Sequence, residues 1–207
     1  MRVGVIGAGG RMGRLIVKLC HEAKNMEVVA ASEVPGSELI GQDAGELAGI
    51  GSIGVTVEGD AETVIQTVDV AIEFSIPTAT AQHAKLAAKH KTAYVTGTTG
   101  LDANQEAELA SAGKKIPIVY APNMSVVVNV FMNLVERVAS ILDPEYDIEI
   151  MEMHHKHKID APSGTAVGLG KAAARGRGVN LDDVAIWSRE GETGERPDGA
   201  IGFATLR

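Results

Sequence analysis

Aromatic side chains and cysteines are both scarce in this chain. Aromatic residues make up only 3% of the 207 residues, so the core has to be built mainly from aliphatic side chains, alanine and glycine. Cores of this kind are typical of parallel sheets covered by helices. The single cysteine, Cys20, cannot form an internal disulfide, and nothing in the composition indicates an oxidising compartment.

Long hydrophobic runs and an excess of positive charge are also missing. The mainly apolar stretch at residues 121–135 is shorter than the ~20 residues that a membrane-spanning helix needs, and Pro122 interrupts it. The first residues lack the basic and apolar regions of a secretory signal. A net charge of −8 argues against a nucleic acid or an anionic membrane as partner. We therefore expect a cytoplasmic protein without either partner.

Glycine, by contrast, is abundant at 24 residues, which points to tight backbone turns around ligands. Over the first 120 residues, short apolar stretches alternate with stretches of helical pattern, and this alternation predicts a doubly wound parallel α/β sheet. The expected strands cover residues 2–6, 28–33, 68–74, 92–96 and 116–120, and the later helices cover 77–90 and about 102–112. Residues 34–59 should be mostly loop.

The remaining residues predict a second domain. A helix from Ser125 to Leu142 is apolar on nearly every side, so it should be buried in a core or between subunits. A strand at 147–153 follows, then a helix at 164–174 that the segment 175–178 ends, and a strand at 200–207. That strand would leave an unpaired edge, which suggests a longer natural product. We expect domains at 1–124 and 125–207, the second of them α+β and incomplete at its C-terminal end.

The stretch Gly7-Ala8-Gly9-Gly10-Arg11-Met12-Gly13 follows the first strand and opens a helix with Met12, Leu15, Ile16 and Leu19 on one face. Glu33 lies 20 positions after Gly13, at the end of the second strand. Glycines let the backbone approach a pyrophosphate, the helix amides receive its charge, and an acid at this distance holds the adenosine ribose. The pattern predicts a dinucleotide site. The alternative is a turn that uses glycine only for close packing.

Small residues also follow a later strand, in Gly97-Thr98-Thr99-Gly100. Open α/β sheets bind ligands at the carboxyl ends of their strands, so this segment is a second candidate for the ligand site. As a single motif it could equally be a plain turn.

A basic cluster follows the strand at 147–153 and combines proton donors with positive charge. The stretch Glu152-Met-His154-His155-Lys156-His157-Lys158-Ile-Asp160-Ala-Pro162-Ser163-Gly164-Thr165 holds three of the six histidines. Histidine exchanges protons near neutral pH, and a partly desolvated lysine can donate one. Ser163 or Thr165 could cap a helix whose N-terminal amides face an anion. These features together predict a site for a carboxylated substrate.

Two other interpretations of the basic cluster are a solvated charged loop and a zinc site. Charge runs are usually solvated. The histidines at 154, 155 and 157 lack the i, i+4 pair of a helical zinc site, and Cys20 is far away, so we expect no metal.

Several of these motifs, in this order, resemble the bacterial dihydrodipicolinate reductase family of the diaminopimelate and lysine pathway. The most specific is the stretch from Glu152 to Thr165. It is accompanied by Gly7–Gly13, Gly97–Gly100, Arg189-Glu190-Gly191 with Thr193–Arg196, and Ile201–Thr205. The resemblance covers essentially the whole chain. It implies a Rossmann-like domain, a substrate and oligomerisation domain, and a homotetramer. It also implies NADH- or NADPH-dependent reduction of 4-hydroxy-tetrahydrodipicolinate or dihydrodipicolinate, a cyclic dicarboxylate, to tetrahydrodipicolinate.

The resemblance also implies roles for individual residues. His154 would be the acid/base residue and Lys158 the proton donor, while His155, Gly164 and Thr165 would hold the substrate carboxylates. Cofactor binding would involve Gly7, Ala8, Gly9, Gly10, Arg11, Met12, Glu33, Gly97, Thr98, Thr99, Ala121, Pro122, Asn123 and Met124.

Two departures from the family pattern matter. Members that favour NADPH often have basic residues where this chain has Val34 and Ile76, so we predict a lean towards NADH. Family chains also continue beyond the position of Arg207. The competing interpretations are another two-domain amino-acid or semialdehyde dehydrogenase, or a nucleotide-binding protein without catalysis.

Overall fold

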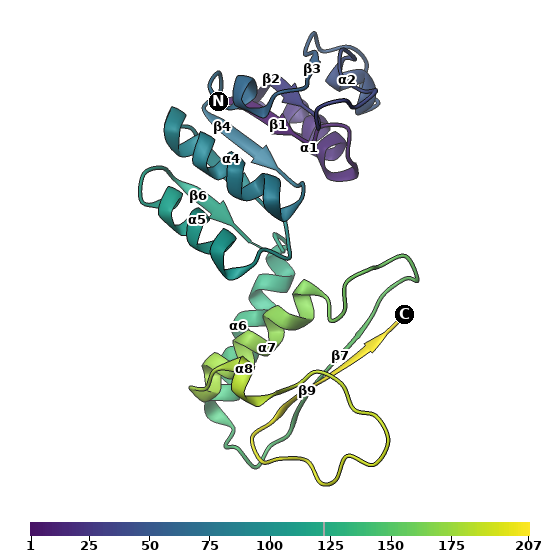
Figure 1. Ribbon diagram of the computed structural model, residues 1–207, viewed down its shortest axis with the longest axis vertical. Helices are drawn as coiled ribbons and strands as arrows, with labels where there is room; N and C mark the ends of the chain where they lie inside the picture. Colours follow the sequence, from purple (N-terminus) through teal and green to yellow (C-terminus); the bar gives the residue numbers. More distant parts are fainter. Residues whose placement is uncertain (122) are drawn as a thin grey trace. The chain divides into compact units, whose positions relative to one another are not determined.

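The computed structural model describes residues 1–121 and 123–207 and divides the chain into two compact units, Met1–Ala121 and Pro122–Arg207. Each unit has its own sheet and its own helices (Figure 1). Among the described residues, no helix is both long and apolar enough to cross a membrane.

The first unit contains a six-stranded sheet in the order β3-β2-β1-β4-β5-β6, and every paired strand is parallel. The strands are β1 (Arg2–Ile6), β2 (Glu27–Ser32), β3 (Val57–Glu58), β4 (Val70–Glu73), β5 (Ala93–Thr96) and β6 (Ile118–Tyr120). The strand order reverses between β1 and β4, which makes the carboxyl ends of these strands the place where a doubly wound sheet binds its ligand. The predicted doubly wound parallel sheet is confirmed.

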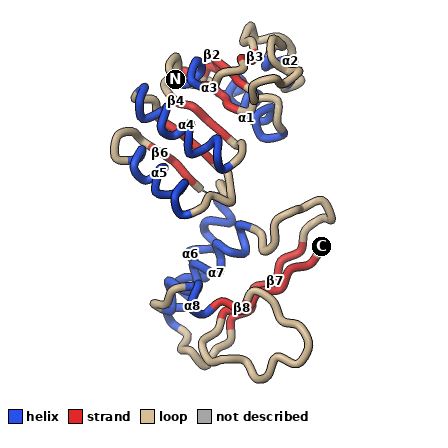
Figure 2. The backbone as a smooth tube through the Cα atoms, in the orientation of Figure 1, coloured by secondary structure: helices blue, strands red, loops and turns tan. Residues whose placement is uncertain are grey.

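Helices cover both faces of this sheet (Figure 2). They are α1 (Arg11–Glu22), α2 (Ala44–Leu47), α3 (Ala61–Ile65), α4 (Pro77–His90) and α5 (Ala103–Gly113). On one face Val3 and Val5 pack with Val17 of α1, and on the other Tyr94 packs with Ile65 of α3. The predicted helix at 77–90 is confirmed, and the short elements α2, α3 and β3 were not predicted because they are too brief to show a period.

The apolar residues that share one face of α1 in the sequence pattern are mostly not the residues that the helix buries. The buried residues of α1 are Gly13, Val17 and Cys20, whereas Met12, Leu15 and Leu19 are exposed. A Cβ atom at Gly13 would lie 2.1 Å from the carbonyl oxygen of Gly7, so α1 approaches the loop after β1 too closely for a larger side chain. On the buried face of α1, the close approach of the helix to the loop after β1 requires a small residue at Gly13, whatever its hydrophobicity.

The second unit contains a smaller parallel sheet in the order β7-β9-β8. Its elements are α6 (Val126–Ile141), β7 (Ile148–Met153), α7 (Gly164–Arg177), α8 (Leu181–Val184), β8 (Ala185–Ile186) and β9 (Ile201–Leu206). Ile150, Ile201 and Phe203 pack against Ala173 and other small residues of α7, which forms the core. The strand β9 pairs with β7 along its whole length but with β8 only at Ile201 and Gly202. Among the described residues, the edge of residues 203–206 away from β7 therefore has no strand partner, in line with the expected unpaired edge.

Two further expectations for this unit are corrected. The helix α7 does not end at Ala174 but continues to Arg177, with Gly178 as its left-handed C-cap at φ 67°. A Cβ at Gly176 would lie 2.2 Å from the carbonyl oxygen of Glu136, so glycine here allows α7 to pack closely on α6 rather than breaking it. The helix α6 begins after the Ser125 cap as predicted. Ala139 is its only buried residue within this chain, so burial in the core of this unit is wrong, and burial between subunits stays a prediction.

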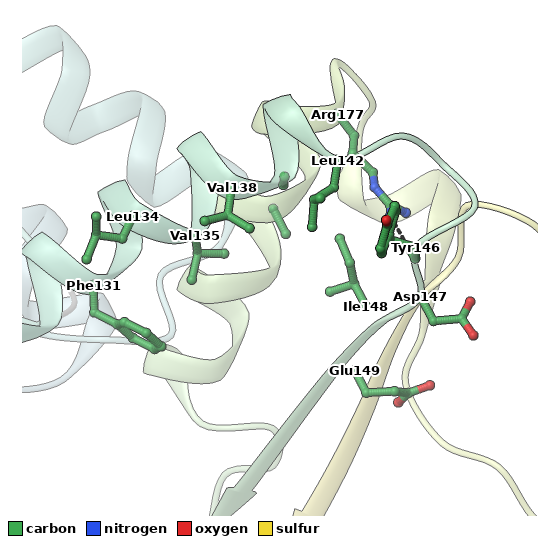
Figure 3. A pocket seen from close by; sticks show the side chains of 12 residues that line it. Phe131, Leu134, Val135, Val138, Leu142, Tyr146, Asp147, Ile148, Glu149 and Arg177 are labelled. Carbon is green, nitrogen blue, oxygen red and sulfur yellow. Dashed lines mark hydrogen bonds between the residues drawn. The ribbon is translucent and has the colours of Figure 1, made fainter.

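An apolar groove runs along α6 (Figure 3). It encloses about 400 Å³ between α6, the start of β7 and the end of α7. The residues that line it are Phe131, Leu134, Val135, Val138, Ala139, Leu142, Tyr146, Asp147, Ile148, Glu149, Ala173 and Arg177.

Candidate active site

The glycine loop after β1 is held against the end of β2. The backbone N–H groups of Gly7 and Ala8 donate to the carbonyl oxygen of Ser32 at 2.8 and 3.0 Å. Gly7 has φ 74°, a left-handed conformation that glycine adopts without steric cost. The N-cap of α1, Gly10, has no side chain to satisfy the amides of the first turn, where Arg11 and Met12 lie. Those amides are therefore available to an anion.

Glu33 lies beside this loop. Its carboxylate accepts hydrogen bonds from the N–H of Gly9 at 2.7 Å and from the N–H of Val34 at 3.1 Å. A Cβ at Gly9 would lie 2.2 Å from Cδ1 of Leu39 and 3.1 Å from Oε1 of Glu33, so a larger residue here would have to displace the Leu39 side chain and crowd the Glu33 carboxylate. The glycine loop and the acid, 24 residues apart in sequence, meet as a dinucleotide site requires.

The predicted second ligand segment lies at the ends of β4 and β5. The N–H of Gly97 donates to the carbonyl oxygen of Glu73 at 3.2 Å, and the N–H of Ser75 donates to Oγ1 of Thr98 at 3.0 Å. A Cβ at Gly97 would lie 2.0 Å from the ring of Phe74, so the backbone passes directly over that ring. These contacts fix Gly97 and Thr98, next to Thr99, at the carboxyl edge of the sheet.

The segment 121–124 falls partly in each unit. The N–H of Ala121 donates to the carbonyl oxygen of Thr96 at 3.3 Å, beside the segment described above. Pro122 lies outside the described residues. In the second unit, Nδ2 of Asn123 donates to Oγ1 of Thr165 at 3.1 Å, so a predicted cofactor residue contacts a predicted substrate residue. Met124 is exposed.

The basic cluster begins where β7 ends, and Glu152 lies at its centre. The carboxylate of Glu152 contacts Nδ1 of His154, accepts from the N–H of Ser163 at 3.1 Å, and pairs with the guanidinium of Arg207 at 3.1 Å. Partial burial raises the pKa of Glu152, but the hydrogen bonds from His154, Ser163 and Arg207 outweigh it, and the pKa is lowered overall. Glu152 is therefore a carboxylate at neutral pH.

Two other charged residues of the cluster pair with each other. Nζ of Lys158 contacts Oδ1 of Asp160 at 2.7 Å, and this hydrogen bond is the main reason that the pKa of Asp160 is lowered. The ring of His155 lies 6.0 Å from the ring of His157, measured between centroids. Figure 1 shows this segment as the long loop between β7 and α7.

The helix α7 begins directly after this loop. Ser163 is the N-cap, and its hydroxyl accepts from the N–H of Ala166 at 3.2 Å. Gly164 and Thr165 are the first helical residues, so their amides belong to the first turn, where an anion is stabilised. Among residues 1–121 and 123–207, no three His, Cys, Asp or Glu side chains gather closely enough to hold a metal ion.

A doubly wound sheet with a glycine loop and a matching acid, followed by a second unit with a basic loop, defines a class: the two-domain nicotinamide-dependent oxidoreductases. Comparison with known proteins makes this more specific. The family model described as "Dihydrodipicolinate reductase, N-terminus" matches residues 1–124, and the model described as "Dihydrodipicolinate reductase, C-terminus" matches residues 127–207.

Individual relatives agree with the family models. A 4-hydroxy-tetrahydrodipicolinate reductase from Magnetococcus marinus is 52% identical over 207 residues, which are 100% of this chain and 77% of that protein. One from Acinetobacter baumannii is 50% identical over 206 residues and is covered to 75%. The solved structure of a dipicolinate-bound dihydrodipicolinate reductase from Paenisporosarcina sp. TG-14 matches with a TM-score of 0.64 at 26% identity, covering 100% of this chain and 78% of that one.

The chain therefore belongs to the dihydrodipicolinate reductase family. It is an oxidoreductase, and it has the reductase function that its relatives carry in lysine biosynthesis. The family uses NADH or NADPH.

Proposed function

We propose that this chain reduces 4-hydroxy-tetrahydrodipicolinate, or its dehydrated form, to tetrahydrodipicolinate, with the residues of the first unit holding the nucleotide and those of the second unit holding the substrate. The observation that carries the proposal is the basic cluster. His154, Lys158 and the first turn of α7 lie within one loop and the helix that follows it. Such a site provides proton donors and positive charge for a dicarboxylate.

The first unit fits a nicotinamide dinucleotide, because Glu33 lies within hydrogen-bond distance of the glycine-loop amide. The amides of Gly9 and Gly10 and of the first turn of α1, with Arg11 and Met12, would receive the pyrophosphate. Glu33 would bind the adenosine ribose, and Gly97–Thr99 with Ala121–Met124 would line the nicotinamide side. The bound cofactor supplies the hydride.

The second unit supplies binding and the proton. Addition of hydride to the conjugated cyclic imine leaves an anionic, enamine-like intermediate, which becomes product when it takes up a proton. Lys158 donates this proton, and its charge stabilises the intermediate. His154 acts as the acid/base residue. His155 and the amides of Gly164 and Thr165 hold the substrate carboxylates.

The roles of Lys158 and His154 are tested by replacing each with alanine. Both variants should lower kcat by about 100-fold or more, the range of a lost general acid, and leave the Kd of the nucleotide unchanged because nucleotide binds through the first unit. Lys156→Ala is the matched control, since Lys156 is exposed in the same cluster. Wild-type turnover in both variants would refute the assigned roles, whereas nucleotide binding without any turnover in the wild type would remove the reductase assignment.

The preference for NADH rests on two exposed apolar residues. Val34 and Ile76 are 67% and 61% exposed, so neither offers a cation to a 2′-phosphate. Val34→Arg should improve kcat/KM for NADPH by about tenfold, the effect of one charge-assisted hydrogen bond, and change the value for NADH little. A clear preference of the wild type for NADPH in matched titrations would contradict this proposal.

We also propose that the chain works in the cytoplasm and assembles as a homotetramer through its second unit. Exposed apolar residues of that unit support the assembly, including Phe131, Leu134, Met151 and Met153. Light scattering coupled to size exclusion would measure the mass, and a purely monomeric species at enzyme-assay concentrations would contradict the tetramer.

A further inference from the structure

We propose that Glu152 is a positioning residue, which sets the orientation and tautomer of the His154 imidazole and ties the start of α7 to the end of β7. The inference rests on the proposed catalytic role of His154. It assigns a function to a carboxylate that neither binds substrate nor exchanges a proton with it. The supporting observations are the register of β7, the contacts of the two carboxylate oxygens, and the nature of the partner groups.

The register of β7 turns Glu152 inward. Side chains alternate along a strand, and Ile148, Ile150 and Glu152 share the face towards the core, whereas Met151 and Met153 are exposed. The side chain of Glu152 is only 9% exposed, compared with 45% for Glu149 on the opposite face. Burying a carboxylate costs free energy unless the carboxylate is paired, so the partners of Glu152 indicate what its side chain does.

The two oxygens of Glu152 have separate tasks. Oε2 contacts Nδ1 of His154, and Oε1 accepts from the N–H of Ser163 at 3.1 Å. The guanidinium of Arg207 spans both oxygens at 3.1 and 3.2 Å. One side chain therefore connects the imidazole to the residue that caps α7.

The contact with Nδ1 selects a tautomer. An ionised carboxylate can only accept, so Nδ1 must carry a proton towards it. Nε2 is then the nitrogen that takes or gives a proton elsewhere. The side chain of His154 is 36% exposed, so Nε2 can meet a ligand while Nδ1 is occupied.

The carboxylate of Glu152 is what keeps the proton on Nδ1. Removal of this carboxylate should therefore release the Nδ1–H tautomer of His154.

The contact with Ser163 places the substrate helix. Ser163 is 3% exposed and lies 11 positions beyond Glu152, across the whole basic loop. Because Gly164 and Thr165 follow directly, Glu152 holds the first turn of α7 at a fixed distance from His154. The Glu152 carboxylate thus fixes the position of the His154 imidazole relative to the amides proposed to bind the substrate.

The test compares Glu152→Gln with Glu149→Gln in the full chain. Both residues lie on β7 and both pair with arginines, but Glu149 contacts Arg189 and Arg196 and, within residues 1–121 and 123–207, no histidine. Glu152→Gln keeps the shape of the side chain and one acceptor for Ser163. It should lower kcat by about tenfold or more, as expected when an imidazole loses the carboxylate that orients it, with the Kd of the nucleotide unchanged. Glu149→Gln should keep wild-type kcat.

Nitrogen-15 NMR of the imidazoles provides a readout that is independent of activity. In the wild type, His154 should be the Nδ1–H tautomer, with its signals assigned by their loss in His154→Asn. In Glu152→Gln the Nε2–H form should become populated, whereas Glu152→Asp should restore the wild-type tautomer. An unchanged tautomer in Glu152→Gln would overturn the proposal. A changed tautomer with unchanged turnover would instead refute the catalytic role of His154.

Two further outcomes also decide the matter. If Glu149→Gln causes the same loss of kcat, any broken carboxylate–arginine pair in this unit suffices and Glu152 has no special role. If Glu152→Gln does not fold, the double variant Glu152→Asp/His154→Asn is compared with the two single variants. Losses that simply multiply would contradict coupling between the two side chains, and a double variant no worse than His154→Asn would support it.

Discussion

The two units bury their apolar surface to very different degrees. In the first unit both faces of the sheet are covered by helices, and most large apolar strand residues are buried. In the second unit helices cover one face only, while Met151, Met153 and Leu206 on the sheet and Phe131 and its neighbours on α6 are exposed. An apolar sequence pattern thus predicts burial well where two layers are present within the same unit, and poorly where one layer is missing.

The largest expected effect separates a buried from an exposed phenylalanine within the second unit. Phe203 is 3% exposed and stacks on Trp187, with ring centroids 4.6 Å apart. Phe203→Ala should lower the free energy of unfolding of this unit by about 3–5 kcal/mol through the lost burial and the cavity. Denaturant titration followed by the fluorescence of Trp187, the only tryptophan, measures it.

At concentrations low enough to keep the chain monomeric, the matched substitution Phe131→Ala should cost less than about 1 kcal/mol, because the ring is 53% exposed within the single chain. An equal loss in the free energy of unfolding for Phe203→Ala and Phe131→Ala would contradict the difference in burial between the two rings. It would mean that the outer face of α6 is covered in solution.

A smaller effect is expected from glycines in the first unit. Gly13→Ala should destabilise this unit by about 1–3 kcal/mol, because its Cβ would approach the backbone of Gly7 and overpack the contact. Gly113→Ala should instead stabilise by about 0.4–1 kcal/mol, since nothing lies within 4 Å and the unfolded chain loses freedom. Circular dichroism during thermal unfolding would compare the two. A neutral Gly13→Ala would show that the first unit is not as tightly packed as its contacts indicate.

The smallest effect concerns Asp43, which holds the long loop of the first unit through polar contacts. Burial raises the pKa of Asp43, but hydrogen bonds from the N–H groups of Ile53, Glu46 and Gly45 and from the hydroxyl of Ser52 outweigh it, and the pKa falls to about 2. A pKa lowered by folding contributes stability that is complete above the ordinary value of 3.8 and is lost as the pH falls through about 2.

Asp43→Asn should therefore lower Tm slightly at pH 7, and the difference from wild type should shrink steadily towards pH 2. Thermal unfolding of both proteins across this pH range is the measurement. A difference that does not change with pH would show that the charge of Asp43 makes no contribution to this loop.

Much of the first unit could be predicted from its sequence because the relevant signals are local. The strand before Gly7, the acid at Glu33 and the proline that opens α4 each depend on a few neighbouring residues. The buried face of α1 and the end of α7 could not be predicted in this way. Both depend on a glycine that is required because a backbone atom outside the helix lies too close for a Cβ atom. This atom is the carbonyl oxygen of Gly7 beside Gly13 and the carbonyl oxygen of Glu136 beside Gly176.

The predicted site shows the same division. The basic cluster was visible in sequence, but the partner of His154 was not assigned. A signal was present, because Glu152 follows Ile148 and Ile150 at the spacing of the inward face of a strand. Arg207 gave no comparable signal, since its contact with Glu152 depends on the pairing of β7 with β9.

The position of β9 has a consequence for the order in which the chain can fold during synthesis. In the first unit the central strand β1 is made first, so β2 and β4 can each add to it as they appear. In the second unit the central strand is β9, which is made after both of its neighbours. Until residues 201–206 leave the ribosome, β7 and β8 lack the strand that joins them in this sheet, so the core that β7, β8 and β9 share cannot close before β9 is made.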